Sequence, residues 1–151
     1  MGLRTTESVV VTAPPSRVFP YVAALDEYPS WLPLVHTAWL EEPDRNPAWL
    51  VEIRARVGPF ARSKRLRMVR TVHETDRLVE FERLELDGRR HARWVLRVEL
   101  APSDEMSTLV TMYLAYDGSL WTGGVLDRVL ADEVRQGRDG LAALVSAAPT
   151  R

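Results

Sequence analysis

Residues 78–100 read LVEFERLELDGRRHARWVLRVEL, and this stretch decides the fold. Apolar and charged residues alternate on both sides of Asp87-Gly88, a dipeptide typical of tight hairpin turns. A two-residue turn there sets Phe81 opposite Trp94. Because side chains alternate between the two faces of a strand, the stretch predicts an antiparallel hairpin with one apolar face and one charged face.

The same alternation extends to both sides of this hairpin, with turn residues between the runs. The predicted strands are Ser8–Thr12, Val35–Glu41, Ala48–Val57, Arg62–His73, Leu78–Leu86, His91–Ala101 and Ser107–Tyr116. Hairpin turns at Thr75-Asp76 and at residues 58–61, together with a pairing of Val98 with Val110, bring the apolar residues to one common face. This inner face is predicted to carry Trp49, Val51, Ile53, Leu66, Met68, Val72, Val79, Phe81, Trp94, Leu96, Val98, Val110, Met112, Leu114 and Tyr116.

Helical segments flank the strands. Pro14 and Pro15 suit the first turn of a short helix, which Pro20 should kink or shorten. Residues 26–33 predict one more helical turn with exposed aromatic side chains. Residues 120–147 repeat apolar side chains at helical spacing and predict one long C-terminal helix.

These elements predict an α+β fold, in which a curved antiparallel sheet of about seven strands wraps around the long C-terminal helix, with two short helices after the first strand. One helix cannot fill an inner face lined by so many large side chains. We therefore expect a cavity of a few hundred cubic ångströms between sheet and helix, the usual scale of a ligand site.

Composition excludes several classes of function. The net charge is −1, which supplies no general attraction to nucleic acid, and we expect no DNA partner. Cysteine is absent, and the three histidines lack metal-ligand spacing, so we expect no metal site and no cofactor. No catalytic motif and no run of transmembrane length occurs, and we predict a single cytoplasmic domain over residues 1–151.

Two stretches resemble a known family. Residues 9–19 (VVVTAPPSRVF) are similar to the entry from strand to helix in the START-like superfamily, also called SRPBCC or helix-grip. Residues 25–33 (LDEYPSWLP) resemble a segment of its polyketide cyclase/dehydrase and coenzyme-Q-binding branch. The resemblance implies the helix-grip fold over nearly the whole chain. The superfamily includes carriers, cyclases, hormone receptors and a bacterial ribosome-association toxin, so fold alone does not select a function.

The predicted ligand site combines inner-face residues with residues of the loops and the long helix. Its members are Trp31, Trp49, Val51, Phe60, Met68, Arg70, Phe81, Arg83, Trp94, Leu96, Met112, Leu114, Tyr116, Trp121 and Leu126. Trp31 and Phe60 are expected to act as movable gates at the entrance. Arg70 and Arg83 interrupt the apolar face, and a buried arginine needs either an internal carboxylate or a polar group on a ligand. We expect Arg70 to point inward between Trp49 and Phe81 and to orient the polar end of the ligand.

Three functions fit these features. The leading hypothesis is a binding module, a carrier, sensor or sequestering protein, for a small hydrophobic molecule such as a lipid, quinone or polyketide. The second is an enzyme of the aromatase/cyclase or dehydratase kind, which would need titratable groups inside the cavity. The third is a protein-interaction module like the toxin branch.

That third function would use a basic hairpin, whose cations are Arg54, Arg56, Arg62, Lys64, Arg65, Arg67 and Arg70. The alternative for the hairpin is a solvated outer face, balanced by Glu80, Glu82, Glu85 and Glu99 on neighbouring strands.

Overall fold

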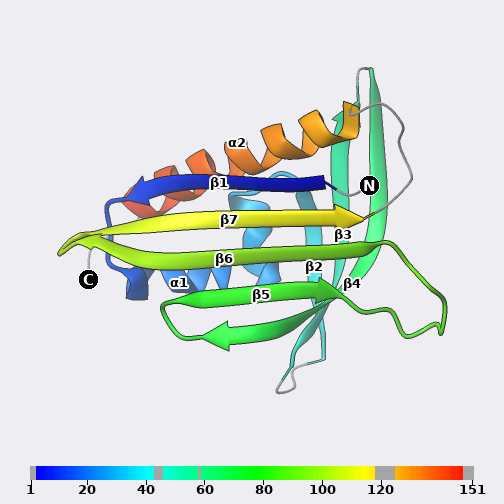
Figure 1. The fold of residues 1–151 in the computed structure, drawn as a ribbon, viewed down its shortest axis with the longest axis horizontal. Coiled ribbons are helices and arrows are strands. Elements are labelled where there is room, and N and C mark those ends of the chain that lie inside the picture. The colour runs from blue at the N-terminus through cyan, green and yellow to red at the C-terminus, as the bar shows by residue number, and fades with distance from the viewer. Residues whose placement is uncertain (1–2, 43–45, 58, 118–124, 148–151) are drawn as a thin grey trace.

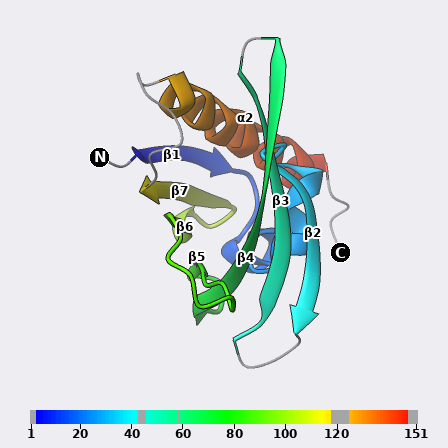
Figure 2. The ribbon, with the colours of Figure 1, turned by 90° about the vertical axis from the view of Figure 1, so that its right-hand side faces the viewer.

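The structure is a computed structural model that describes residues 3–42, 46–57, 59–117 and 125–147. A single antiparallel sheet has the strand order β1-β7-β6-β5-β4-β3-β2. The strands are β1 (Leu3–Val11), β2 (Val35–Glu42), β3 (Ala48–Val57), β4 (Phe60–Glu74), β5 (Leu78–Arg83), β6 (Arg93–Asp104) and β7 (Ser107–Asp117). The sheet curls, so that the β3–β4 hairpin runs across the direction of β7 and β1 (Figures 1 and 2).

Three helices complete the fold: α1 (Pro15–Val22), the 3-10 helix η1 (Leu25–Ser30) and α2 (Val125–Ala147). The long α2 lies across the concave face of the sheet (Figure 1). Proline at the start of α1 accounts for its position directly after β1, and Pro20 lies within this short helix. The predicted helix-grip architecture is confirmed. Within the described residues, no helix is both long and apolar enough to cross a membrane.

The pairing of the strands differs from the predicted register at three hairpins. Ile53 pairs with Lys64 rather than Leu66, because Val57 already pairs with Phe60 and the turn is shorter than predicted. Phe81 pairs with Leu96 rather than Trp94, because residues 84–92 form a longer loop.

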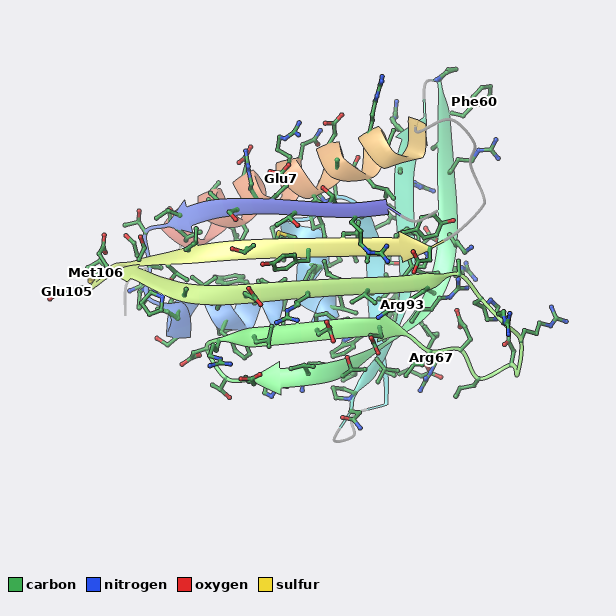
Figure 3. The ribbon with its side chains drawn as sticks, in the orientation of Figure 1. Glu7, Phe60, Arg67, Arg93, Glu105 and Met106 are labelled. Atoms are coloured by element: carbon green, nitrogen blue, oxygen red, sulfur yellow. The ribbon has the colours of Figure 1, made fainter. Side chains whose placement is uncertain are left out.

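The third difference lies at the β6–β7 hairpin. Val98 pairs with Met112 rather than Val110, because β6 continues to Asp104 and the hairpin turns at Glu105 and Met106 (Figure 3). Each of the three shifts is two residues long. Since side chains alternate with a period of two, these three shifts move no apolar residue off its predicted face.

The β4–β5 hairpin contains a bulge that the prediction missed. Arg70 pairs with Phe81 as expected, but Val72 pairs with Glu80 and not with Val79. The connection has three residues, with Asp76 in the left-handed region at φ 62°. The bulge moves Val72 from the predicted inner face to the outer one. His73 takes the place opposite Val79, and its ring packs on that of Phe19 at 5.4 Å.

Close packing of α2 against Trp31 and Leu32, the two residues that follow η1, covers one part of the concave face. The buried stripe of α2 comprises Leu130, Val134, Gly137, Leu141 and Val145. A Cβ atom at Gly140 would lie 2.6 Å from the carbonyl oxygen of Trp31, and one at Gly137 would collide with the Leu32 side chain. Only glycine permits this approach of helix to backbone.

Candidate functional site

An apolar cavity lies between the sheet and α2, and its volume is about 40 Å³. Its wall combines residues of η1, of the segment that follows it, of five strands and of α2. The lining residues are Leu25, Leu32, Leu34, Val35, Val51, Ile53, Leu66, Met68, Trp94, Leu96, Leu114 and Val134. No titratable side chain belongs to this lining. The cavity is thus in the predicted place but far smaller than the predicted few hundred cubic ångströms.

Aromatic side chains of the η1 segment account for the small volume. Tyr28 and Trp31 are buried, with 0% and 3% of their surface exposed, whereas the sequence predicted exposed aromatics here. The Tyr28 hydroxyl donates to the Val22 carbonyl oxygen at 2.8 Å, and burial raises the pKa of Tyr28 well above its ordinary value. The Trp31 Nε1 donates to the Tyr21 carbonyl oxygen at 3.0 Å. Trp31 is therefore held in the core, so its predicted exposure is wrong, and its role as a movable gate stays a prediction.

The three-residue spacing from Leu25 to Tyr28 and from Tyr28 to Trp31 was the overlooked signal. It places these side chains on one side of a 3-10 turn, so they face the sheet together. Leu32, Leu34 and Val35 follow, and all three line the cavity without having been predicted as site residues.

Only some of the predicted site residues line the cavity. Val51, Met68, Trp94, Leu96 and Leu114 line the cavity. Trp49, Phe81, Met112 and Tyr116 are buried in the surrounding core, where the rings of Trp49 and Phe81 meet edge to face at 5.5 Å. Phe60 is 65% exposed at the tip of the β3–β4 hairpin, away from the cavity (Figure 3). Trp121 and the side chain of Leu126 lie outside the described part of the chain.

Arg70 points inward as predicted and finds its partners within the protein. Its Nη1 donates to the carbonyl oxygen of Ala23 at 2.7 Å, and its guanidinium lies 5.8 Å from the ring centre of Trp49. Ala23 caps the C-terminus of α1, so the arginine contributes a positive charge where the helix presents free carbonyl groups. The Arg70 Nε is buried and has no acceptor in the part of the chain that the structure describes. Burial lowers the pKa of Arg70.

Arg83 has an internal carboxylate, the alternative that the sequence left open. Its side chain is 6% exposed, and its Nε lies 2.7 Å from Glu85 Oε2. The Nη1 donates to the Ala92 carbonyl oxygen at 3.3 Å, and the Nη2 lies 3.3 Å from His91 Nδ1. His91 in turn contacts Asp87 at 2.8 Å. These bonds hold the ends of the loop at 84–92 beside the sheet.

One polar group of the cavity wall lacks a partner. The Trp94 Nε1 is buried, and it donates to no acceptor within the described residues. The indole packs on the Tyr116 ring with their centres 4.4 Å apart. Because a buried N–H without an acceptor is costly, this donor is a candidate for contact with a ligand.

Two larger hollows, of about 330 and 420 Å³, lie on the outer face of the sheet. Ion pairs occupy their walls, including Arg67 with Glu41 at 3.1 Å and Arg97 with Glu99 at 2.7 Å. We assign the candidate site to the smaller inner cavity, because it alone of these three is apolar and lies between sheet and helix.

The basic hairpin finds other partners than those predicted. Arg67 and Arg65 pair with Glu41 and Glu52. The expected carboxylates pair elsewhere: Glu82, Glu85 and Glu99 contact arginines of β5 and β6. Within the described residues, no group of three or more His, Asp or Glu side chains could hold a metal ion.

Known proteins share this architecture. A START superfamily protein from Mycobacterium smegmatis superposes with a TM-score of 0.75 at 15% identity, covering 95% of this chain and 97% of that one. A protein from Thermus thermophilus gives 0.77 at 17% identity, covering 97% and 99%. The Zhui aromatase/cyclase from a Streptomyces species gives 0.73 at 12% identity, covering 97% and 94%.

Comparison with curated protein sequences finds no significant match. The family model described as polyketide cyclase/dehydrase and lipid transport matches residues 3–146, nearly the whole chain. With a sheet curled around α2 and an apolar cavity between them, the chain belongs to this family and shares the fold of the START superfamily protein.

Proposed function

We propose that this protein binds a small hydrophobic molecule between the sheet and α2. The observation that carries the proposal is the apolar lining of the cavity, which includes Trp94, whose buried indole N–H finds no acceptor among the residues that the structure describes. A ligand with an apolar body and a carbonyl or hydroxyl oxygen would satisfy both features.

Binding requires the cavity to widen, since a volume of about 40 Å³ admits only a few atoms. The closest packing of α2 lies at Gly137 and Gly140, in the second half of the helix. Space for a ligand would therefore open toward the first half of α2, by a movement about the tight contact with Trp31 and Leu32. Val134 lines the cavity one turn before these glycines.

A substitution at Val134 tests the location of the site. Phenylalanine in place of Val134, which is 0% exposed, would occupy the space that a ligand needs. We expect Val134→Phe to weaken binding of the neutral fluorescent probe N-phenyl-1-naphthylamine at least tenfold, with a loss of about 1–3 kcal/mol in stability from overpacking. Gln136→Phe, an exposed position on the same helix, is the matched control. Equal probe affinity in both variants would contradict the proposed site, and native mass spectrometry would show whether a molecule co-purifies.

An aromatase/cyclase activity is the second candidate, favoured by the structural similarity to the Zhui aromatase/cyclase. Such chemistry needs a group that moves a proton near the substrate. The described lining of the cavity has no titratable side chain, which favours binding over catalysis. Turnover of a polyketide-like chain by the purified protein would reverse this preference.

A further inference from the structure

Two cations lie on the concave face beside the apolar lining of the cavity, at a rim toward the β3–β4 hairpin. Lys64 pairs with Ile53 and lies two residues before Leu66, and both of those residues line the cavity. Residues paired across strands, and residues two apart in one strand, share a face of the sheet, so Lys64 lies on the concave face. The sequence had assigned Lys64 to a solvated outer face.

Arg83 reaches the same rim from the neighbouring strand. It pairs with Met68, another cavity residue, and its side chain is almost fully buried. Figure 2 looks along the molecule from this end, where β4, β5 and β6 come close to the viewer. The rim thus consists of two cations, Lys64 and Arg83, beside Trp94 of the cavity wall.

The carboxylate at the rim is already engaged. Glu85 accepts from Arg83 Nε at 2.7 Å and from the backbone N–H of Arg67 at 3.4 Å. Within the described residues, no carboxylate lies within 4.0 Å of the Lys64 ammonium. The pKa of Lys64 is lowered by burial and then by Arg83, and Glu85 only partly offsets this. Two positive charges therefore share one negative charge at the mouth of an apolar cavity.

We infer that the ligand is amphipathic and carries a carboxylate, which Lys64 binds at the rim while the apolar body lies in the cavity. This inference rests on the proposed function. A carboxylate would supply the missing negative charge and accept a charge-assisted hydrogen bond from the ammonium group. Arg83 is a positioning residue here, since Glu85 and the Ala92 carbonyl oxygen hold it in place and its charge adds to that of Lys64.

The test compares decanoate with decan-1-ol, which has the same chain and no charge. Both compete at pH 8 with N-phenyl-1-naphthylamine for the protein and its variants. We expect the wild-type protein to bind decanoate about tenfold more tightly than decan-1-ol, the effect of one charged hydrogen bond. Lys64→Met should reduce this ratio to about one, because decanoate loses its charged partner. Lys64→Arg should retain most of the preference.

Arg65→Met is the matched control, because Arg65 neighbours Lys64 in β4 but is 90% exposed on the outer face. The preference of Arg65→Met for decanoate over decan-1-ol should equal that of the wild type. Circular dichroism checks folding, and Lys64→Gln provides the same comparison should Lys64→Met not fold. Equal affinity of the wild type for acid and alcohol, or an undiminished preference in Lys64→Met, would refute the carboxylate site alone. Failure of both compounds to displace the probe would refute the proposed function itself.

Discussion

Arg70 illustrates how a single buried charge is accommodated. It breaks the apolar alternation of β4, yet its guanidinium is stabilised by the Ala23 carbonyl oxygen and by the face of Trp49. Both contacts lie within the protein, and one of them neutralises the exposed carbonyl end of α1. The residue therefore joins α1 to the sheet, and this structural role is sufficient to explain its position.

Replacement of Arg70 by methionine separates structure from binding. We expect Arg70→Met to lower the free energy of unfolding by about 1–3 kcal/mol, because it removes a charged hydrogen bond and a cation–π contact. Probe affinity should stay the same. Chemical denaturation and probe titration measure the two quantities, with Arg56→Met, at an exposed position of the β3–β4 hairpin, as the control. A tenfold loss of affinity without a loss of stability would show that Arg70 contacts the ligand instead.

At the scale of elements, the contact of α2 with the residues that follow η1 determines how much space remains in the interior. The buried rings of Tyr28 and Trp31 lie 4.5 Å apart, and Tyr28 meets Phe81 at 5.9 Å. These side chains fill volume that the sequence had assigned to a ligand. Glycine at positions 137 and 140 lets α2 closely approach Leu32 and Trp31, which directly follow η1.

Alanine substitutions at the two glycines should have unequal effects. Alanine favours a helix over glycine by about 1 kcal/mol. At Gly140 the new Cβ would lie 2.6 Å from the backbone oxygen of Trp31. A backbone oxygen cannot move without the rest of the chain, so we expect the free energy of unfolding to fall by about 1–3 kcal/mol. At Gly137 the new Cβ meets the end of the Leu32 side chain, which can rotate. Thermal unfolding of both variants measures the difference, and a Gly140→Ala protein as stable as the wild type would disprove the tight contact.

At the scale of the whole molecule, α2 covers the concave face of the sheet. Its buried stripe packs on the sheet, and Arg138 and Arg135 reach Glu7 of β1 at 2.8 and 3.4 Å. Glu7 lies beside α2 in Figure 3. The ion pairs are partly exposed and contribute little, so the apolar contacts provide most of the attachment.

A chain that ends before Leu126 should fail to fold. Each large apolar side chain of α2 contributes about 1.5–3 kcal/mol on burial, whereas a domain of this size is stable by only about 5–15 kcal/mol. Circular dichroism and a urea titration of the truncated protein should show no cooperative transition. A soluble truncated protein that unfolds cooperatively would contradict this expectation.

The sequence by itself determined the element order, the strand faces and the family resemblance. These depend on local signals: alternation, proline and glycine positions, and short motifs. Even where Phe81 pairs with Leu96 instead of Trp94, the apolar face is correct, because a shift of two residues preserves the alternation. The inward direction of Arg70 followed from the same pattern.

Only the tertiary structure decided the strand register, the size of the cavity and which charged side chains lie near Lys64. Register depends on turn length, which is ambiguous where several turn residues adjoin, and the bulge before Val72 leaves no clear pattern in the sequence. Cavity volume is the small difference between the space inside the sheet and the side chains that enter it, including Tyr28 and Trp31. Lys64 and Arg83 come together because β4 and β5 pair, a long-range contact that no local pattern contains.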